Sequence, residues 1–146
     1  MIFFLNMILV TGLFTAGTLN AECITSDNVK LRIAPSKYAA VTWQVRKYFP
    51  VKKLGETELW MKVLDLEGDK HWVFKQHLTK KYHCVIVKVT EARIKEEPTK
   101  MAKDKYKESA YKYETFKFIS AKKGWIQVKD VYGDVGWITL KEVWVD

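Results

Sequence analysis

The sequence contains few of the residues that build catalytic and metal sites. Its 146 residues include two cysteines, three histidines, three prolines and seven glycines. Cys23 and Cys84 do not form a CxxC pair, and no glycine-rich segment has the spacing of a phosphate-binding loop. His71, His77 and His83 are separated by an expected hairpin and a chain turn, which argues against a shared metal site. We therefore expect no enzyme, no metal and no cofactor.

Arginine is also scarce, although the chain is basic, with a formal net charge of +8 and only 3 Arg against 22 Lys. Arg is the planar fork that grips phosphate and bases, whereas Lys is a hydrated point charge. The Lys residues are spread along the chain, which is typical of a solvated surface. The alternative is attraction to an anionic surface, such as membrane lipid, cell-wall polymer or nucleic acid.

The first 21 residues, MIFFLNMILVTGLFTAGTLNA, lack charge altogether. They are apolar from Ile2 to about Phe14, then turn small and polar up to Ala21, which is the order of a secretory signal peptide. We expect residues 1–21 to be such a signal, with a periplasmic or extracytoplasmic mature protein and no membrane span after signal removal. The alternative is that the segment is retained as an anchor. Export disfavours nucleic acid as a partner.

What the chain does contain is an internal repeat. WMKVLDLEGDKHWVFKQHL, from Trp60 to Leu78, aligns without a gap with WIQVKDVYGDVGWITLKEV, from Trp125 to Val143, and six of the nineteen positions are identical. Aligning Cys23 with Cys84 extends the similarity towards the N-terminus. The repeat predicts two units, residues 22–81 (the first unit) and residues 82–146 (the second unit), with no obvious linker.

Within each unit the hydrophobic pattern has a period of two, as in Val41, Trp43 and Val45, which indicates half-buried strands. The repeated stretch predicts a β-hairpin in each unit, with its turn at Gly68 or Gly133 because glycine adopts positive φ at little cost. The composition, rich in aromatic residues and poor in Gly and Pro, also favours strands.

The order of these motifs resembles the bacterial SH3-like (SH3b) domain family, in two tandem copies after a signal peptide. The residues that carry the resemblance are, in the first unit, Val29-Lys30-Leu31-Arg32, Pro35-Ser36, Trp43-Gln44-Val45, Trp60-Met61-Lys62-Val63, Gly68-Asp69 and Trp72-Val73, and in the second unit Arg93, Pro98, Trp125, Val128, Gly133-Asp134 and Gly136-Trp137-Ile138. The sequence departs from the family pattern at Ala34, which replaces a Gly, and at His71, which stands where the second unit has Gly136.

The resemblance implies an all-β fold of two small SH3-like barrels. It also implies a non-catalytic module that binds peptide or peptidoglycan through shallow aromatic clefts. The alternative is a structural protein of the cell envelope that binds another envelope protein and no wall ligand. Candidate ligand-binding residues are Tyr48, Trp60, Phe74, Tyr106, Tyr111, Tyr113 and Trp125.

The tryptophans and cysteines carry the structural expectations. Trp72 and Trp137 are expected to be core residues, and Trp60 and Trp125 to be partly exposed; the alternative places all four in the core. Cys23 and Cys84 occupy equivalent positions in the two units. They form a disulfide if the units pack around a local two-fold axis. Otherwise they are small buried hydrophobes in separate cores.

Overall fold

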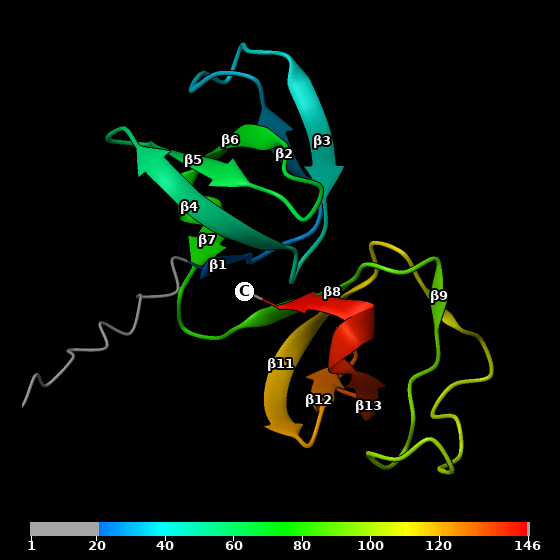
Figure 1. The fold of residues 1–146 in the computed structure, drawn as a ribbon. Coiled ribbons are helices and arrows are strands. Elements are labelled where there is room, and N and C mark those ends of the chain that lie inside the picture. Colours follow the sequence, from blue (N-terminus) through cyan, green and yellow to red (C-terminus); the bar gives the residue numbers. More distant parts are fainter. Residues whose placement is uncertain (1–20, 146) are drawn as a thin grey trace, which may run out of the picture.

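The computed structural model describes residues 21–145, and the expected signal peptide lies outside them apart from Ala21 (Figure 1). The described chain is all-β, as predicted, and its only helices are two three-residue 3-10 helices, η1 (Lys75–His77) and η2 (Leu140–Glu142). Neither of these, nor any other helix between residues 21 and 145, has the length and apolar character needed to cross a membrane.

The first unit forms one seven-stranded antiparallel sheet with the order β3-β2-β6-β5-β4-β1-β7. Its strands are β1 (Ala21–Ile24), β2 (Val29–Arg32), β3 (Val41–Val45), β4 (Pro50–Glu56), β5 (Trp60–Leu64), β6 (Lys70–Phe74) and β7 (Leu78–Thr79). The sheet does not close on itself, so β3 and β7 are its two edges; this open, strongly bent sheet (Figure 1) is consistent with the expected small SH3-like barrel.

The second unit has a five-stranded sheet with the order β13-β12-β11-β8-β14, and a separate two-stranded sheet of β9 and β10. Its strands are β8 (Cys84–Val87), β9 (Glu91–Ala92), β10 (Ala110–Tyr111), β11 (Thr115–Lys122), β12 (Trp125–Lys129), β13 (Val135–Thr139) and β14 (Val143–Val145). Residues 93–109, between β9 and β10, form no named strand and touch the five-stranded sheet through a bridge from Lys95 to Trp137.

Both predicted hairpins are confirmed. β5 pairs with β6 and β12 with β13, each over five residue pairs. The turn glycines adopt the left-handed conformation, with φ of 86° at Gly68 and 94° at Gly133, where a Cβ would be strained.

Each unit has its own hydrophobic core, and strand β8 lies between the two (Figure 1). All four residues of β8 are buried. Because successive strand side chains point to opposite faces, Val85 and Val87 enter the core of the second unit while Ile86 enters that of the first. Trp144 on β14 also packs against the first core. Division into domains at residues 81 and 82 therefore stays a proposal, because one strand serves both cores.

Trp72 and Trp137 are half-buried and lie outside both cores, which corrects the expectation for them. Burial alternates along β6 and β13: the buried neighbours of Trp72 are His71 and Val73, and those of Trp137 are Gly136 and Ile138. The period of two thus directs both indole rings to the outer face of each hairpin. Trp60 and Trp125 are also half-buried.

Candidate functional site

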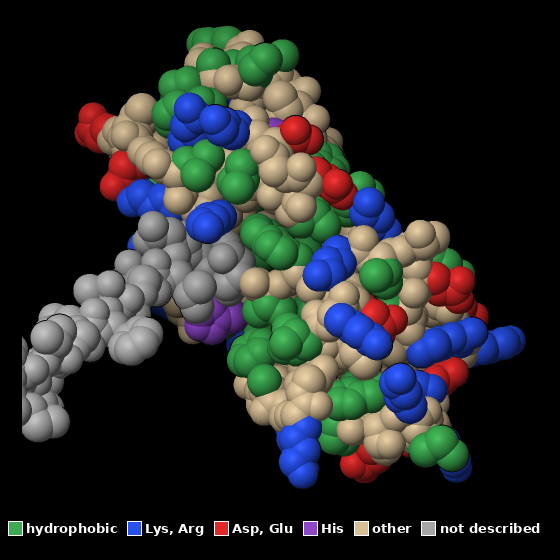
Figure 2. Space-filling view, viewed as in Figure 1, with side chains coloured by type: hydrophobic (Ala, Val, Ile, Leu, Met, Phe, Trp, Pro, Cys, Tyr) green, Lys and Arg blue, Asp and Glu red, His purple; other side chains and the backbone are tan. Residues whose placement is uncertain are grey.

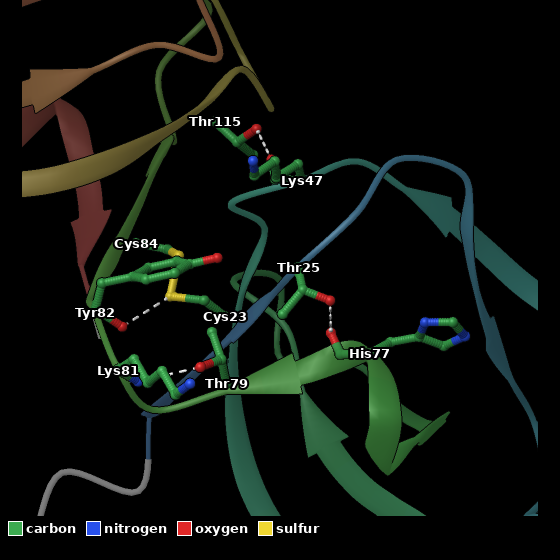
Figure 3. The surroundings of a disulfide bond; sticks show 9 residues. All are labelled: Cys23, Thr25, Lys47, His77, Thr79, Lys81, Tyr82, Cys84 and Thr115. Atoms are coloured by element: carbon green, nitrogen blue, oxygen red, sulfur yellow. Dashed lines mark hydrogen bonds between the residues drawn. A yellow bond between two sulfur atoms is a disulfide. The ribbon is translucent and has the colours of Figure 1, made fainter. Parts of the chain in front are cut away.

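A disulfide joins the two units, so the bridged alternative for the cysteines is the one the structure contains (Figure 3). The Cα atoms of Cys23 and Cys84 are 5.8 Å apart, within the usual range for a disulfide. Cys23 lies in β1, next to the edge strand β7, and Cys84 is the first residue of β8, so the two equivalent positions meet where the units touch. Both residues are buried, with 2% and 1% of their surface exposed.

Tyr48 belongs to this junction and not to a ligand site, contrary to expectation. Its ring packs edge-on against Tyr82, with centroids 5.7 Å apart, in a small cluster with the two cysteines. Only 9% of Tyr48 is exposed, and its backbone N–H donates to the carbonyl of Ile24. Burial, then the nearby Tyr48, raises the pKa of Tyr82. These two rings therefore shield the disulfide.

The units make polar and aromatic contacts beside this junction. The hydroxyl of Thr115 donates to the carbonyl of Lys47 at 2.7 Å (Figure 3). Farther along, the ring of Tyr113 packs edge-on against Trp43, with centroids 5.2 Å apart, and its hydroxyl donates to Glu67 at 3.0 Å.

Lys112 adds an ion pair to the same carboxylate, with 3.1 Å between its Nζ and Oε1 of Glu67. Hydrogen bonding from Lys112, then from Tyr113, lowers the pKa of Glu67, and the same carboxylate raises the pKa of Lys112. All of these groups are exposed, so the pair is screened by solvent and serves to position the 111–114 turn.

Between these contacts lies a groove of about 820 Å³, lined by both units, which we call the inter-unit groove. Its lining comes from the β1–β2 turn, the end of β3 and the β3–β4 turn, the end of β10 and the turn before β11, and the β12–β13 turn: Asp27, Asn28, Trp43, Gln44, Val45, Arg46, Phe49, Tyr111, Lys112, Tyr113, Glu114, Val131 and Tyr132. Trp43 packs edge-on against Phe49 as well as Tyr113. Tyr132 is 89% exposed.

Two further depressions adjoin the inter-unit groove. The first shares Asp27 and Asn28 with it and is lined by the edge-on pair of Trp60 and Phe74, with centroids 5.3 Å apart. Gln44, which lines the inter-unit groove, donates a hydrogen bond of 3.1 Å to Asn28, which lines both. The second shares five residues with the inter-unit groove: Arg46, Tyr111, Glu114, Val131 and Tyr132.

This second depression is lined by Tyr106, which is half-buried and donates its hydroxyl to Oδ2 of Asp130 at 2.8 Å. Burial, and then the hydrogen bond to Asp130, raises the pKa of Tyr106, so the phenol stays neutral and remains a donor. We use the name aromatic track for the three adjoining depressions together.

Five of the seven predicted ligand residues lie along the aromatic track: Trp60, Phe74, Tyr106, Tyr111 and Tyr113. Trp125 does not, because it lines a separate depression near Lys95 and Lys141 that shares no residue with the track. Sequence reasoning missed Trp43 and Tyr132. The sequence offered a signal for Trp43, because it lies in a strand with alternating apolar residues. It offered none for Tyr132, which aligns with Glu67 in the repeat.

A hydroxyl, an imidazole and a carboxylate do line up in the first unit. His71 Nδ1 lies 2.7 Å from Oγ1 of Thr42, and its Nε2 lies 2.8 Å from Oδ2 of Asp65. The other oxygen of Asp65 accepts the backbone N–H groups of its own turn, from Glu67 and Asp69. None of the three side chains lines the aromatic track, so this network ties strand β3 to the β5–β6 turn.

Residues 21–145 hold no group of three or more His, Cys, Asp or Glu side chains placed to bind a metal ion. On the face seen in Figure 2, Lys and Arg side chains are scattered among hydrophobic ones over both units and do not merge into one basic patch. That distribution agrees with the solvated-surface interpretation of the lysines.

A protein-family model described as "Bacterial SH3 domain" matches residues 25–80. The match agrees with the resemblance for the first unit and suggests a binding module. The second unit lies outside the matched segment, so its identification as a tandem copy stays a prediction. No curated protein matches the chain.

Solved structures that resemble the chain include NlpC1 and NlpC2 from Trichomonas vaginalis and an NlpC/P60 family protein from Bacillus cereus ATCC 10987. NlpC1 is 17% identical, with 95% of this chain and 50% of that one covered and a TM-score of 0.38. NlpC2 is 15% identical, with 86% of this chain and 47% of that one covered and a TM-score of 0.37. The Bacillus cereus protein is 13% identical, with 86% of this chain and 56% of that one covered and a TM-score of 0.38. The chain thus spans about half the length of these structures, and similarity at this level carries no functional conclusion.

Proposed function

We propose that this chain is an exported, non-catalytic binding module that recognises peptides, with the peptide stems of the bacterial cell wall as the ligand. The observation that carries the proposal is the aromatic track, which continues across both units. A match to the bacterial SH3 domain model over residues 25–80 supports it.

An extended peptide suits the geometry of the track for two reasons. Aromatic rings give an adaptable apolar floor at low entropic cost, and Tyr and Trp are the usual anchors of such sites. Strand β3, which ends in the inter-unit groove, is also an edge of its sheet. A peptide can add itself to such an edge through main-chain hydrogen bonds while its side chains contact the rings.

Export is supported by the uncharged, apolar residues 1–21 and by the disulfide between Cys23 and Cys84. Disulfides form and persist in oxidising compartments such as the periplasm and are rare in the bacterial cytosol. N-terminal sequencing of the protein from its native host tests this part. A mature chain beginning near Glu22 supports it, and a chain still beginning at Met1 in the cytosol contradicts it.

Binding is tested by titrating the folded protein with muropeptides and with the free peptide stem released from them, using tryptophan fluorescence and amide chemical shifts. Tyr132→Ala removes a ring that is 89% exposed, so folding should be unaffected. Because loss of an anchor ring costs more than about 1 kcal/mol, we expect about a five- to tenfold loss of affinity.

Tyr38→Ala is the matched control, because Tyr38 is 86% exposed and lies outside the track. The proposal fails if neither ligand shifts the amides around the track, or if the two variants bind alike. If the protein is instead retained by a protein of the envelope fraction and does not bind the insoluble wall, the structural alternative is favoured, in which it binds another envelope protein.

A further inference from the structure

The charges along the aromatic track are unevenly distributed between its two ends. The depression with Trp60 and Phe74 is also lined by Lys30, Arg32 and Lys37, against the single carboxylate of Asp27. We call it the basic end.

The depression with Tyr106 has the opposite balance. It is lined by Glu108, Glu114 and Asp130, against the single guanidinium of Arg46. We call it the acidic end. The inter-unit groove between the two ends is balanced, with Asp27 and Glu114 against Arg46 and Lys112.

Internal contacts leave part of this charge available to a ligand. At the basic end, Arg32 donates to the carbonyl of Ala39, whereas Lys30 is exposed on the outer side of β2. At the acidic end, Asp130 accepts the hydroxyl of Tyr106 and two backbone N–H groups. Glu108 is exposed and adds a carboxylate that the turn does not use. Each end therefore offers a charged side chain that holds no turn or strand in place.

We infer that the track binds a dipolar peptide in one direction, with a carboxylate of the peptide at the basic end and an amino group at the acidic end. This rests on the proposed function, since it assigns a ligand chemistry and an orientation to the same site. The reverse orientation places carboxylate against carboxylate and amine against amine. The preference therefore includes the repulsion in the wrong orientation as well as the attraction in the right one.

The size of the effect follows from exposure. Ion pairs on a protein surface are individually weak, and capping one end of the peptide should reduce affinity by about two- to fivefold at low salt. The difference between capped and free peptide should shrink as ionic strength rises, because the Debye length falls to about 8 Å at physiological salt. Contacts of the rings with the peptide should not change with salt to the same extent.

The experiment compares three forms of the free peptide stem: unmodified, acetylated at its amino groups, and amidated at its carboxylates. Each is titrated against the wild-type chain, Glu108→Gln and Lys30→Gln. Acetylation should weaken binding to wild type and to Lys30→Gln but have little further effect in Glu108→Gln. Amidation should weaken binding to wild type and to Glu108→Gln but have little further effect in Lys30→Gln.

Glu97→Gln and Lys103→Gln are the controls, because both residues are exposed and neither lines the track. Their titrations should match wild type for all three peptides. The inference is overturned if all three peptides bind wild type equally, or if the controls behave like the track variants. It is also overturned if Glu108→Gln removes the effect of amidation and Lys30→Gln removes the effect of acetylation. If the unmodified stem does not bind and the amide chemical shift of Tyr132 does not change, the proposed function itself is wrong.

Discussion

The β5–β6 turn of the first unit and the β12–β13 turn of the second are built alike. In each, an aspartate accepts two backbone N–H groups through Oδ1: Asp65 from Glu67 and Asp69, and Asp130 from Tyr132 and Asp134. The backbone hydrogen bonds that close the turns also correspond, with Asp65 N to Asp69 O at 3.0 Å and Asp130 N to Asp134 O at 2.9 Å.

The two turns differ at the second carboxylate oxygen. In the first unit it meets His71, whose other ring nitrogen reaches Thr42 on β3. In the second unit the position of His71 is Gly136, where a Cβ would collide with the side chain of Ile94 and lie 3.2 Å from the carbonyl of Lys95. The segment 93–109 therefore packs where a histidine would stand, and the carboxylate is met by Tyr106 instead.

This difference shows how one turn can serve two purposes. The first unit uses its aspartate to fix an edge strand from inside, with Asp65 only 2% exposed. The second uses it to hold a tyrosine on the aromatic track, with Asp130 half-buried. A single choice between His and Gly thus separates a structural turn from one that supports the candidate site.

The largest expected effect comes from breaking the link that holds the two units together. Replacing Cys23 and Cys84 with alanine opens a loop of 61 residues, and the chain-entropy model gives a loss of about 4 kcal/mol. We expect a lower melting temperature in thermal denaturation and a lower midpoint in chemical denaturation, with less cooperative unfolding of the two units. Reduction of the wild-type protein is the control, since it opens the same loop without altering the side-chain packing. Unchanged melting in both samples would show that packing alone holds the units together.

His71→Ala tests the first turn. It leaves the buried Asp65 carboxylate without its side-chain partner, and hydrogen bonds to charged groups contribute about 1.5–3 kcal/mol, so we expect a loss of about 2–3 kcal/mol. Tyr106→Phe is the counterpart in the second turn, where partial exposure of Asp130 limits the cost to about 1 kcal/mol. Urea denaturation measures both. Equal losses would mean that the two turns are interchangeable.

Gly136→Ala tests why the second unit has no side chain at that position. The new methyl group must displace Ile94, and overpacking of this kind costs about 1–3 kcal/mol. Gly55→Ala is the control, since a Cβ there meets nothing within 4 Å and should change stability by less than about 0.5 kcal/mol. If Gly136→Ala is as stable as Gly55→Ala, the 93–109 segment does not exclude the side chain.

The smallest expected effect concerns acid. Because Lys112 and Tyr113 hold the pKa of Glu67 below its ordinary 4.5, their contact stabilises the docked units above that pH and is lost as the pH falls through the lowered pKa. Glu67→Gln should therefore flatten the acid limb of the stability profile below about pH 4.5, and salt should reduce the difference. Glu58→Gln, at an exposed position of the first unit, should leave that limb as in wild type.

The sequence was sufficient for what local periodicity determines. Alternation and turn glycines predicted both hairpins, and the repeat placed the cysteines at equivalent positions. The same periodicity could have placed Trp72 and Trp137 outside the core, because Val73 and Ile138 are their immediate neighbours and equally apolar. The prediction was wrong because it assigned the largest side chains to the core. In a strand, the alternation of the pleat determines which side chains point inward, whatever their size.

The rest depended on contacts between the units, which no local pattern encodes. Tyr48 is hidden because Tyr82, far along the chain, covers it together with the disulfide. Trp43 and Tyr132 join the track because the two units dock with β3 beside the β12–β13 turn. The first core likewise depends on docking, since β8 supplies Ile86 to it.

Strand β8 has a consequence for the order in which the protein is made. The first core includes Ile86 of β8 and packs against Trp144 of β14, and both residues belong to the second unit. Chains are synthesised from the N-terminus at about 5–20 residues per second, and domains generally fold as they emerge. Here the first unit lacks Ile86 and Trp144 until β8 and β14 have been made, so part of its core stays uncovered while the second unit is synthesised. A chain that stops before β14 therefore leaves the part of the first core that Trp144 covers exposed to solvent.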